Sequence, residues 1–246
     1  MIRLERSSTL GRRIRKDSPG RLGVSTWNLL EEAILEGKWE RANEIIDYLY
    51  VGEGKTWHDL NNDFWAALIS YVGHSFGEHE VEKMWREVFA SAIFGPTALT
   101  RTPSAKERVY AAAEIWRAHY VADGQLRIEE KEDCYVMTLS PCPTGGRQRK
   151  EGRLKPPYNL GKTSQPYPWS WSRSNIPWYC THCAIVQAGA VPIESFGYPI
   201  RVQEYPEDPE DPSCRIIFYK NPELIPEDYF KKLGYQKDPS KFKIMK

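Results

Sequence analysis

The sequence predicts an α+β fold in which a helical bundle is followed by an antiparallel sheet. Apolar residues recur every three or four positions in the first half, and beyond Gly124 they alternate in several short runs. Between those runs, residues 141–178 are so rich in proline and tryptophan that we expect a long functional loop there. With 246 residues, 41% of them hydrophobic, the chain can bury a substantial core.

Three regions are expected along the chain. Residues 1–24 carry arginine and lysine among serine and glycine, which predicts a flexible basic arm. Residues 25–123 should form the helical half. Residues 124–246 should form the α+β half, and all five cysteines lie in it.

The helices of the first half are predicted from their caps and apolar spacing. Ser25 and Thr26 offer an N-cap, and Gly37 should divide the helical pattern that follows into two helices. Further helices are expected over 56–72, 81–93 and 105–120. The first of these carries an apolar stripe through Leu60, Phe64, Ala67, Leu68 and Tyr71.

The strands of the second half are predicted as two antiparallel pairs. Residues 126–129 and 134–139 alternate like strands joined by an acidic turn. Residues 200–205 and 214–219 are predicted as a second pair of antiparallel strands, joined by a turn that contains several prolines. Cys134 and Cys214 fall in these strand-like contexts, so we expect them to be structural.

Composition excludes several classes of protein. Thirty-four basic residues against thirty-three acidic ones leave no electrostatic footprint for nucleic acid. No run approaches the roughly 20 apolar residues of a membrane span, and no apolar stretch follows the basic N-terminus as in a secretory signal. An odd number of cysteines favours reduced thiols over a disulfide framework. We therefore expect a soluble cytoplasmic protein.

Cys142 is the strongest candidate nucleophile. It follows a predicted strand and precedes a turn whose Gly145 and Gly146 can direct backbone N–H groups at one point, which suits a carboxylate or an oxyanion. Arg147 and Arg149 would lower the pKa of a nearby thiol and bind an acidic substrate. His182 is the candidate base. The plain alternative is a tight turn with a buried cysteine and two solvated arginines.

The same cysteines also suit a metal. Cys180 and Cys183 form a Cys-x-x-Cys unit, and zinc prefers thiolate ligands in tetrahedral sites. With Cys142 as the third ligand, the fourth could be a remote histidine, solvent or Cys134. We expect these three cysteines to meet in space.

Aromatic residues in the long loop suggest how a ligand is held. Trp169, Trp171 and Trp178 can form a wall against a flat ring, or they can anchor the loop on the helical half. His58 opens a predicted helix and can add a polar wall to the pocket, or lie on a solvated face.

The C-terminal pattern resembles two families over about the last fifth of the chain. It reads Gly197-x-Pro199-x-Arg201-Val202-x-Glu204, then Asp-Pro repeats, then Pro212-Ser213-Cys214-Arg215-x-Ile217. This is similar to the closing hairpin of 4-vinyl-reductase-type small-molecule-binding domains and to the end of L-2-amino-thiazoline-4-carboxylate hydrolase-like proteins. The resemblance implies a pocket between helices and sheet for a small organic acid or ring. The Cys142 loop and the Trp-rich segment depart from it.

The sequence thus predicts an enzyme of hydrolase or lyase type. Its substrate would be a small aromatic or heterocyclic carboxylate, handled at a cysteine-centred site that holds zinc beside the Gly145-Gly146-Arg147 turn. Two alternatives stay open: a small-molecule sensor domain with a structural zinc, and an accessory subunit of another enzyme. Expected partners are the carboxylate ligand and a second copy of the chain, without nucleic acid or membrane.

Overall fold

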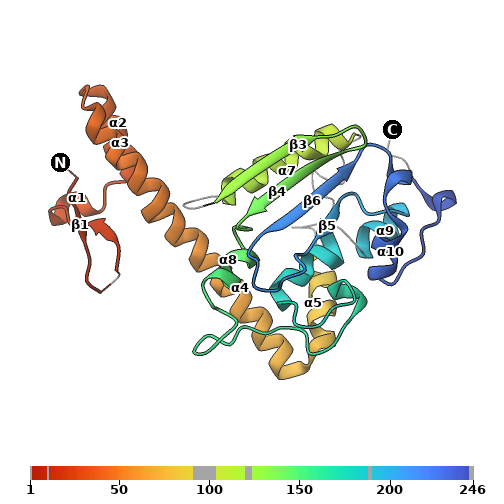
Figure 1. Cartoon of the computed structure of the whole chain (residues 1–246). Coiled ribbons are helices and arrows are strands. Elements are labelled where there is room, and N and C mark those ends of the chain that lie inside the picture. The colour runs from red at the N-terminus through yellow and green to blue at the C-terminus, as the bar shows by residue number, and fades with distance from the viewer. Residues whose placement is uncertain (1, 10, 91–103, 120–123, 188–189, 244–246) are drawn as a thin grey trace. The chain divides into compact units, whose positions relative to one another are not determined.

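The computed structural model describes residues 2–9, 11–90, 104–119, 124–187 and 190–243, and it confirms the α+β class (Figure 1). Helices dominate the first half, and an antiparallel sheet of four strands lies in the second. The chain divides into two compact units, residues 1–62 and 63–246. We call them the N-terminal unit and the C-terminal unit and describe each by itself.

The N-terminal unit begins with a hairpin where the sequence predicted a flexible arm. Strands β1 (Leu4–Arg6) and β2 (Arg13–Arg15) pair antiparallel. Helices α1 (Pro19–Leu22), α2 (Thr26–Leu35) and α3 (Trp39–Asp47) follow, and a π-helical stretch over Tyr48–Gly54 leads into α4. The hairpin forms because charged side chains of the basic segment find partners inside the unit.

The predicted caps account for the α2–α3 corner. The Ser25 hydroxyl accepts a hydrogen bond from the Trp27 N–H at 3.3 Å, and Gly37 takes the left-handed φ of +69° that reverses the chain. The apolar faces of the helices then close on a core made by Ile2, Leu29, Leu30, Ala33, Ala42, Ile45 and Leu49.

A buried ion pair ties the hairpin to the helices. Arg15 Nη2 lies 2.7 Å from Asp17 Oδ2, with 8% and 0% of the two side chains exposed. Arg15 also donates to the carbonyl oxygens of Val24 and Arg21 at 2.6 and 2.7 Å. Burial alone would raise the pKa of Asp17, but hydrogen bonds from the Arg3 N–H and from Arg15 outweigh it and hold the pKa below its usual value.

We expect Asp17→Ala to lower the free energy of unfolding of the full chain by about 1.5–3 kcal/mol, because buried Arg15 loses its charged acceptor. Since the folded-state pKa of Asp17 is depressed, its contribution is complete above the ordinary pKa near ~3.9 and is lost as the pH falls through the folded value. Denaturant unfolding at pH 7 and in acid measures both effects. Glu36→Ala, which removes an exposed partner of Lys38, is the control; equal losses in the two variants would contradict the assignment.

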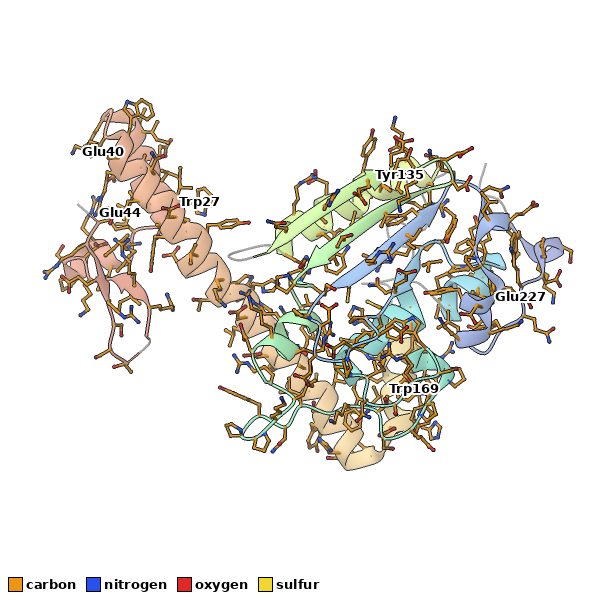
Figure 2. All side chains as sticks on the ribbon, in the orientation of Figure 1. Trp27, Glu40, Glu44, Tyr135, Trp169 and Glu227 are labelled. Carbon is orange, nitrogen blue, oxygen red and sulfur yellow. The ribbon has the colours of Figure 1, made fainter. Side chains whose placement is uncertain are left out.

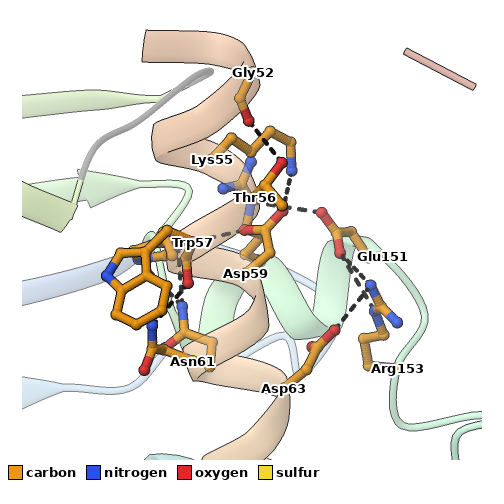
Figure 3. A network of polar contacts seen from close by, with 12 residues as sticks. Gly52, Lys55, Thr56, Trp57, Asp59, Asn61, Asp63, Glu151 and Arg153 are labelled. Atoms are coloured by element: carbon orange, nitrogen blue, oxygen red, sulfur yellow. Dashed lines mark hydrogen bonds and ion pairs between the residues drawn. The ribbon is translucent and has the colours of Figure 1, made fainter. Parts of the chain in front are cut away.

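Three long helices match their predicted positions. They are α4 (Lys55–Phe76), which runs from one unit into the other, α5 (Glu78–Ala90) and α7 (Ala105–His119). The predicted helical ends at residues 91–93 and 120 lie outside the described residues. At the start of α4, the Thr56 hydroxyl donates to the carbonyl of Gly52 in the preceding π-helical stretch at 2.6 Å (Figure 3).

Helix α4 buries the face opposite to its apolar stripe. Phe64 and Tyr71 are 64% and 60% exposed, whereas Ala66, Ser70 and Gly73 are buried. These small residues let the long loop approach the helix closely: the Ser70 hydroxyl accepts the N–H of Gly161 at 2.8 Å. Side-chain volume, and not hydrophobicity alone, therefore decided which face packs.

The sheet has the order β3-β4-β6-β5, antiparallel throughout. Its strands are β3 (Gln125–Glu130), β4 (Cys134–Ser140), β5 (Val202–Glu204) and β6 (Cys214–Tyr219). Both predicted strand pairs are present. The pairing of β4 with β6, which joins them into one sheet, sets Cys134 opposite Tyr219 and Leu139 opposite Cys214.

Each face of the sheet carries its own core. Met137, Leu139 and Ile216 pack with the apolar face of α7, which lies along one side of the sheet (Figure 1). On the opposite face, Val136 and Ile217 pack with residues from the long loop and from the C-terminal segment. Helix α7 thus shares a core with the sheet, so the predicted boundary at residues 123 and 124 does not separate two domains.

The C-terminal unit is completed by short elements. Helix α8 (Gly145–Lys150) begins the long loop, and α9 (Ala190–Phe196) and α10 (Glu227–Lys232) follow later. Single turns of 3-10 helix cover Pro168–Ser170, Trp178–Cys180, Pro222–Leu224 and Pro239–Lys241, and a π-helical turn covers Cys183–Gln187.

Charged contacts fasten the start of the loop to α4. Arg153 lies between Asp63 and Glu151, at 3.3 and 3.4 Å from their carboxylates (Figure 3). Within the described residues, no helix combines the length and the apolar character needed to cross a membrane.

Candidate thiol site

Four cysteines line one cavity at the end of the sheet. Cys142 and Cys214 belong to the core on the α7 side, and Cys180 and Cys183 belong to the core on the opposite face. The cavity lies where the two cores meet. The space open to the centre of a water-sized molecule is about 20 Å³, enough for one small group. The structure thus brings together the three cysteines singled out from the sequence and adds Cys214.

Strand pairing places Cys142 beside Cys214. Strand β4 ends at Ser140, and its Leu139 lies opposite Cys214 at the start of β6. The Cys142 N–H then donates to the Pro212 carbonyl at 2.8 Å, which holds the loop against the residues before β6. Cys214 is therefore part of the site and not a structural cysteine, whereas Cys134 lies at the far end of β4.

Hydrogen-bonding groups lie around the Cys142 sulfur. The Thr144 hydroxyl is 3.5 Å from it, and Cys214 lines the same cavity. Hydrogen bonds lower the pKa of Cys142 to about 5, although burial opposes them, and the largest of these causes is the bond from the Cys214 thiol. The same bond, with burial, raises the pKa of Cys214. Within the pair, Cys142 is therefore the more acidic thiol and Cys214 the less acidic one.

The glycine turn faces the thiol itself. The sequence predicted that its N–H groups would bind a carboxylate or an oxyanion; hydrogen bonds from the Thr144 and Gly146 N–H groups to the Cys142 sulfur are among the causes that lower the pKa of Cys142. Both glycines are required by space: a Cβ on Gly145 would lie 2.3 Å from Cys180 Sγ, and one on Gly146 would lie 1.9 Å from the Pro212 oxygen. The close approach of three chain segments at this turn is what brings the cysteines together.

Arg149 is the cation at the site. Its guanidinium lies 3.5 Å from Cys180 Sγ and 4.0 Å from Cys214 Sγ, and it stacks on the Tyr205 ring at 4.7 Å. Arg147, the predicted catalytic arginine, lies 3.5 Å from the Glu151 carboxylate. Both arginines are buried, so the alternative of two solvated arginines is wrong.

His182 lines the cavity but is not placed as a base for Cys142. Its Nδ1–H donates to the Tyr179 carbonyl at 2.5 Å, and its Nε2 lies 3.5 Å from Cys183 Sγ. Burial lowers the pKa of His182 to about 4, so the ring is neutral at pH 7. With Nδ1 protonated, Nε2 is an acceptor for the Cys183 thiol.

The three tryptophans have different roles. Trp171 contributes to the cavity wall. Trp178 fills a slot over Gly73 and Gly161. Trp169, which is labelled in Figure 2, is buried and stacks on the Tyr167 ring. These last two anchor the long loop, as one of the two interpretations expected.

His58 belongs to the N-terminal unit. Its ring nitrogens lie 3.1 Å from the Asn62 amide nitrogen, and Nδ1 is 3.3 Å from the Asp59 carboxylate. It does not appear among the residues that line the cavity, so the predicted polar wall is made by other side chains.

Zinc remains a prediction from the sequence. In the part of the chain that the structure describes, no three or more His, Cys, Asp or Glu side chains are placed so that they could hold a metal ion. Arg149 puts a permanent positive charge next to two of the sulfurs, which favours an anion over a second cation.

Three residues of the site were not predicted from the sequence. Cys214 would have been found if strands 134–139 and 214–219 had been paired, because that pairing sets it beside Leu139. Gln203 and Tyr205 line the cavity from the end of β5, and both are buried. A buried glutamine in a short strand indicates a polar site, but the sequence alone does not show that Gln203 is buried.

Comparison of the chain with family models, with curated proteins and with solved structures finds no match. The resemblance of the C-terminal hairpin to two families therefore stays a prediction.

Proposed function

We propose that the protein is a thiol-dependent enzyme in which the Cys142 thiolate is the nucleophile. The observation that carries the proposal is the position of Cys142: it is buried, it lines the cavity beside Cys214, its sulfur is 3.5 Å from the Thr144 hydroxyl, and hydrogen bonds there lower its pKa. A buried anion costs free energy unless it is stabilised in this way, and a purely structural cysteine has no need of it.

The surroundings favour a small reacting group. A space of about 20 Å³ admits one or two atoms, so an aromatic ring would have to widen the cavity before it reached the sulfur. Hydrolysis through a covalent acyl intermediate also needs a base for water. His182, the predicted base, is neutral but engaged at both nitrogens. The proposal therefore keeps the thiol chemistry expected from the sequence and leaves out zinc and the carboxylate substrate.

The proposal is tested by titrating the thiolate absorbance near 240 nm. We expect one thiolate per chain at pH 7 that disappears as the pH falls through about 5, because an acid with a lowered pKa stays ionised above that value. Cys142→Ser should abolish this signal, and Cys134→Ser should leave it unchanged.

Two outcomes would overturn the proposal. One is a protein whose thiols all ionise above pH 8 with Cys142 intact. The other is stoichiometric zinc that survives dialysis, since zinc-bound thiolates also absorb and would restore the metal prediction. Metal analysis of the same sample separates these outcomes.

A further inference from the structure

We propose that the thiol site reduces hydroperoxides, with Cys142 as the residue that attacks the peroxide and Cys214 as the thiol that resolves the oxidised product. This inference rests on the proposed nucleophilic role of Cys142 and names the substrate class of that site. It is carried by the position of the two thiols at one cavity, by the size of that cavity and by two buried polar atoms of residues that line it.

The two sulfurs belong to residues that line the same cavity, and a hydrogen bond between them shifts the pKa of both thiols. The ladder between β4 and β6 fixes the backbone that carries Cys214. A cysteine that is oxidised by peroxide and recovered through a disulfide needs a second thiol within reach. Neither cysteine forms a disulfide in the structure.

The size and the lining of the cavity are complementary to a small polar group. Gln203 Oε1 and the Tyr205 hydroxyl are both buried, both residues line the cavity, and neither atom has a hydrogen-bond partner among the described residues. Unpaired buried polar atoms are costly, so a group that fits this space gains by pairing with them. An S–OH group on Cys142 offers a donor for the glutamine oxygen and an acceptor for the phenol. A space of about 20 Å³ suits an added oxygen atom.

The chemistry balances in three steps. The Cys142 thiolate attacks the terminal oxygen of the hydroperoxide: the S–O bond forms as the O–O bond breaks, giving a sulfenic acid and an alkoxide or hydroxide that takes a proton from solvent. The Cys214 thiol then displaces water from the sulfenic acid and forms the Cys142–Cys214 disulfide. An external dithiol is oxidised as it reduces this disulfide, and both thiols are restored.

Oxidation of Cys142 would itself activate Cys214. The two causes that the thiolate supplies, its hydrogen bond and its charge, raise the pKa of Cys214 in the reduced protein. Both vanish when Cys142 becomes a neutral sulfenic acid, while Arg149 stays 4.0 Å from Cys214 Sγ and favours its ionised form. The resolving thiol therefore becomes more nucleophilic only after the first step.

The experiment treats the reduced full-length protein with one equivalent of hydrogen peroxide at pH 7. In the wild-type chain we expect the loss of two thiols and a disulfide-linked pair of peptides containing Cys142 and Cys214. In Cys214→Ser the sulfenic acid should persist and be trapped on Cys142 by dimedone. With a dithiol present, the wild-type protein should consume peroxide over many turnovers, and Cys142→Ser should consume none.

Cys134 in the same chain is the internal reference for the rate. A pKa of about 5 gives Cys142 about 100-fold more thiolate at pH 7 than an ordinary thiol, but thiolates of low pKa are weaker nucleophiles and most of that gain cancels. The Gln203 oxygen and the Tyr205 hydroxyl, which lack partners within the described residues, belong to residues that line the cavity and can stabilise the transition state. For this reason we expect oxidation of Cys142 at least about tenfold faster than that of Cys134.

The outcomes separate the two proposals. If the 240 nm titration finds the thiolate but Cys142 reacts with peroxide no faster than Cys134, the peroxide assignment is wrong and the thiol enzyme stands. If no thiolate is found, both are wrong. A disulfide from Cys142 to Cys180 would overturn the role of Cys214. Cys142→Ala is a second variant that removes the thiol, and circular dichroism of both Cys142 variants shows whether a loss of activity comes from misfolding.

Discussion

Gly146→Ala is expected to destabilise the C-terminal unit by at least about 3 kcal/mol and to abolish the low-pH thiolate signal of Cys142. The added Cβ would lie 1.9 Å from the Pro212 carbonyl oxygen and 2.8 Å from Cys142 Cβ. The first of these atoms is backbone, and it accepts the Cys142 N–H that holds the loop. Neither side can move without breaking the contact that positions the sulfur.

Denaturant unfolding and the 240 nm titration measure the two consequences of Gly146→Ala. Gly20→Ala is the control, because a Cβ there meets no atom within 4 Å. Gly145→Ala is an informative intermediate: its Cβ would meet Cys180 Sγ, a side-chain atom that can turn away, so a smaller loss of stability is expected. If Gly146→Ala unfolds like the wild type and keeps its thiolate, the close approach of the three segments at this turn is wrong.

Trp178→Ala is expected to lower the free energy of unfolding by about 3–5 kcal/mol, the usual effect of emptying a buried aromatic site. Trp178 is buried in the slot formed by Gly73 on α4 and Gly161 in the loop, where a Cβ on either glycine would come within 2.2 Å of its ring. The Trp178 carbonyl also accepts the hydrogen bond of the Trp85 indole at 3.3 Å. Removing the ring leaves a cavity between the loop and α4.

Chemical denaturation followed by circular dichroism tests Trp178→Ala against Trp27→Ala. Trp27 is 67% exposed, so its replacement should change the stability by less than about 0.5 kcal/mol. Gly73→Ala approaches the same slot from the helix side and should also destabilise, because it pushes the ring out instead of removing it. Equal effects of the two tryptophan variants would mean that the loop is not anchored through Trp178.

Local signals predicted much of the secondary structure. The Ser25 cap, the Gly37 break and the alternation in residues 134–139 each act over a few residues, and the corresponding elements are α2, α3 and β4. The basic segment at the N-terminus was misread because Arg15 is held by Asp17 together with the carbonyl oxygens of Arg21 and Val24, and these acceptors come together only in the folded unit. The apolar stripe of α4 was found, but it does not pack, since the small residues of the other face admit the loop.

Only part of the candidate site could be predicted from the sequence. Cys142, Cys180 and Cys183 stood out by residue type and spacing, and the cavity brings them together. Arg149 and Cys214 could not be distinguished from Arg147 and Cys134 by type. Their roles depend on which way a short helix turns its side chains and on which strands are neighbours.

By itself, the sequence determined the α+β class, most of the helices, both strand pairs and the set of cysteines able to do chemistry. Each of these follows from interactions between residues close in the chain. Tertiary structure decided that β4 pairs with β6, that Cys214 therefore lies at the same cavity as Cys142, and that the glycine turn packs closely against Cys180 and Pro212. The physical reason is that these contacts join segments far apart in the chain, and the distances between them exist only after the chain has folded.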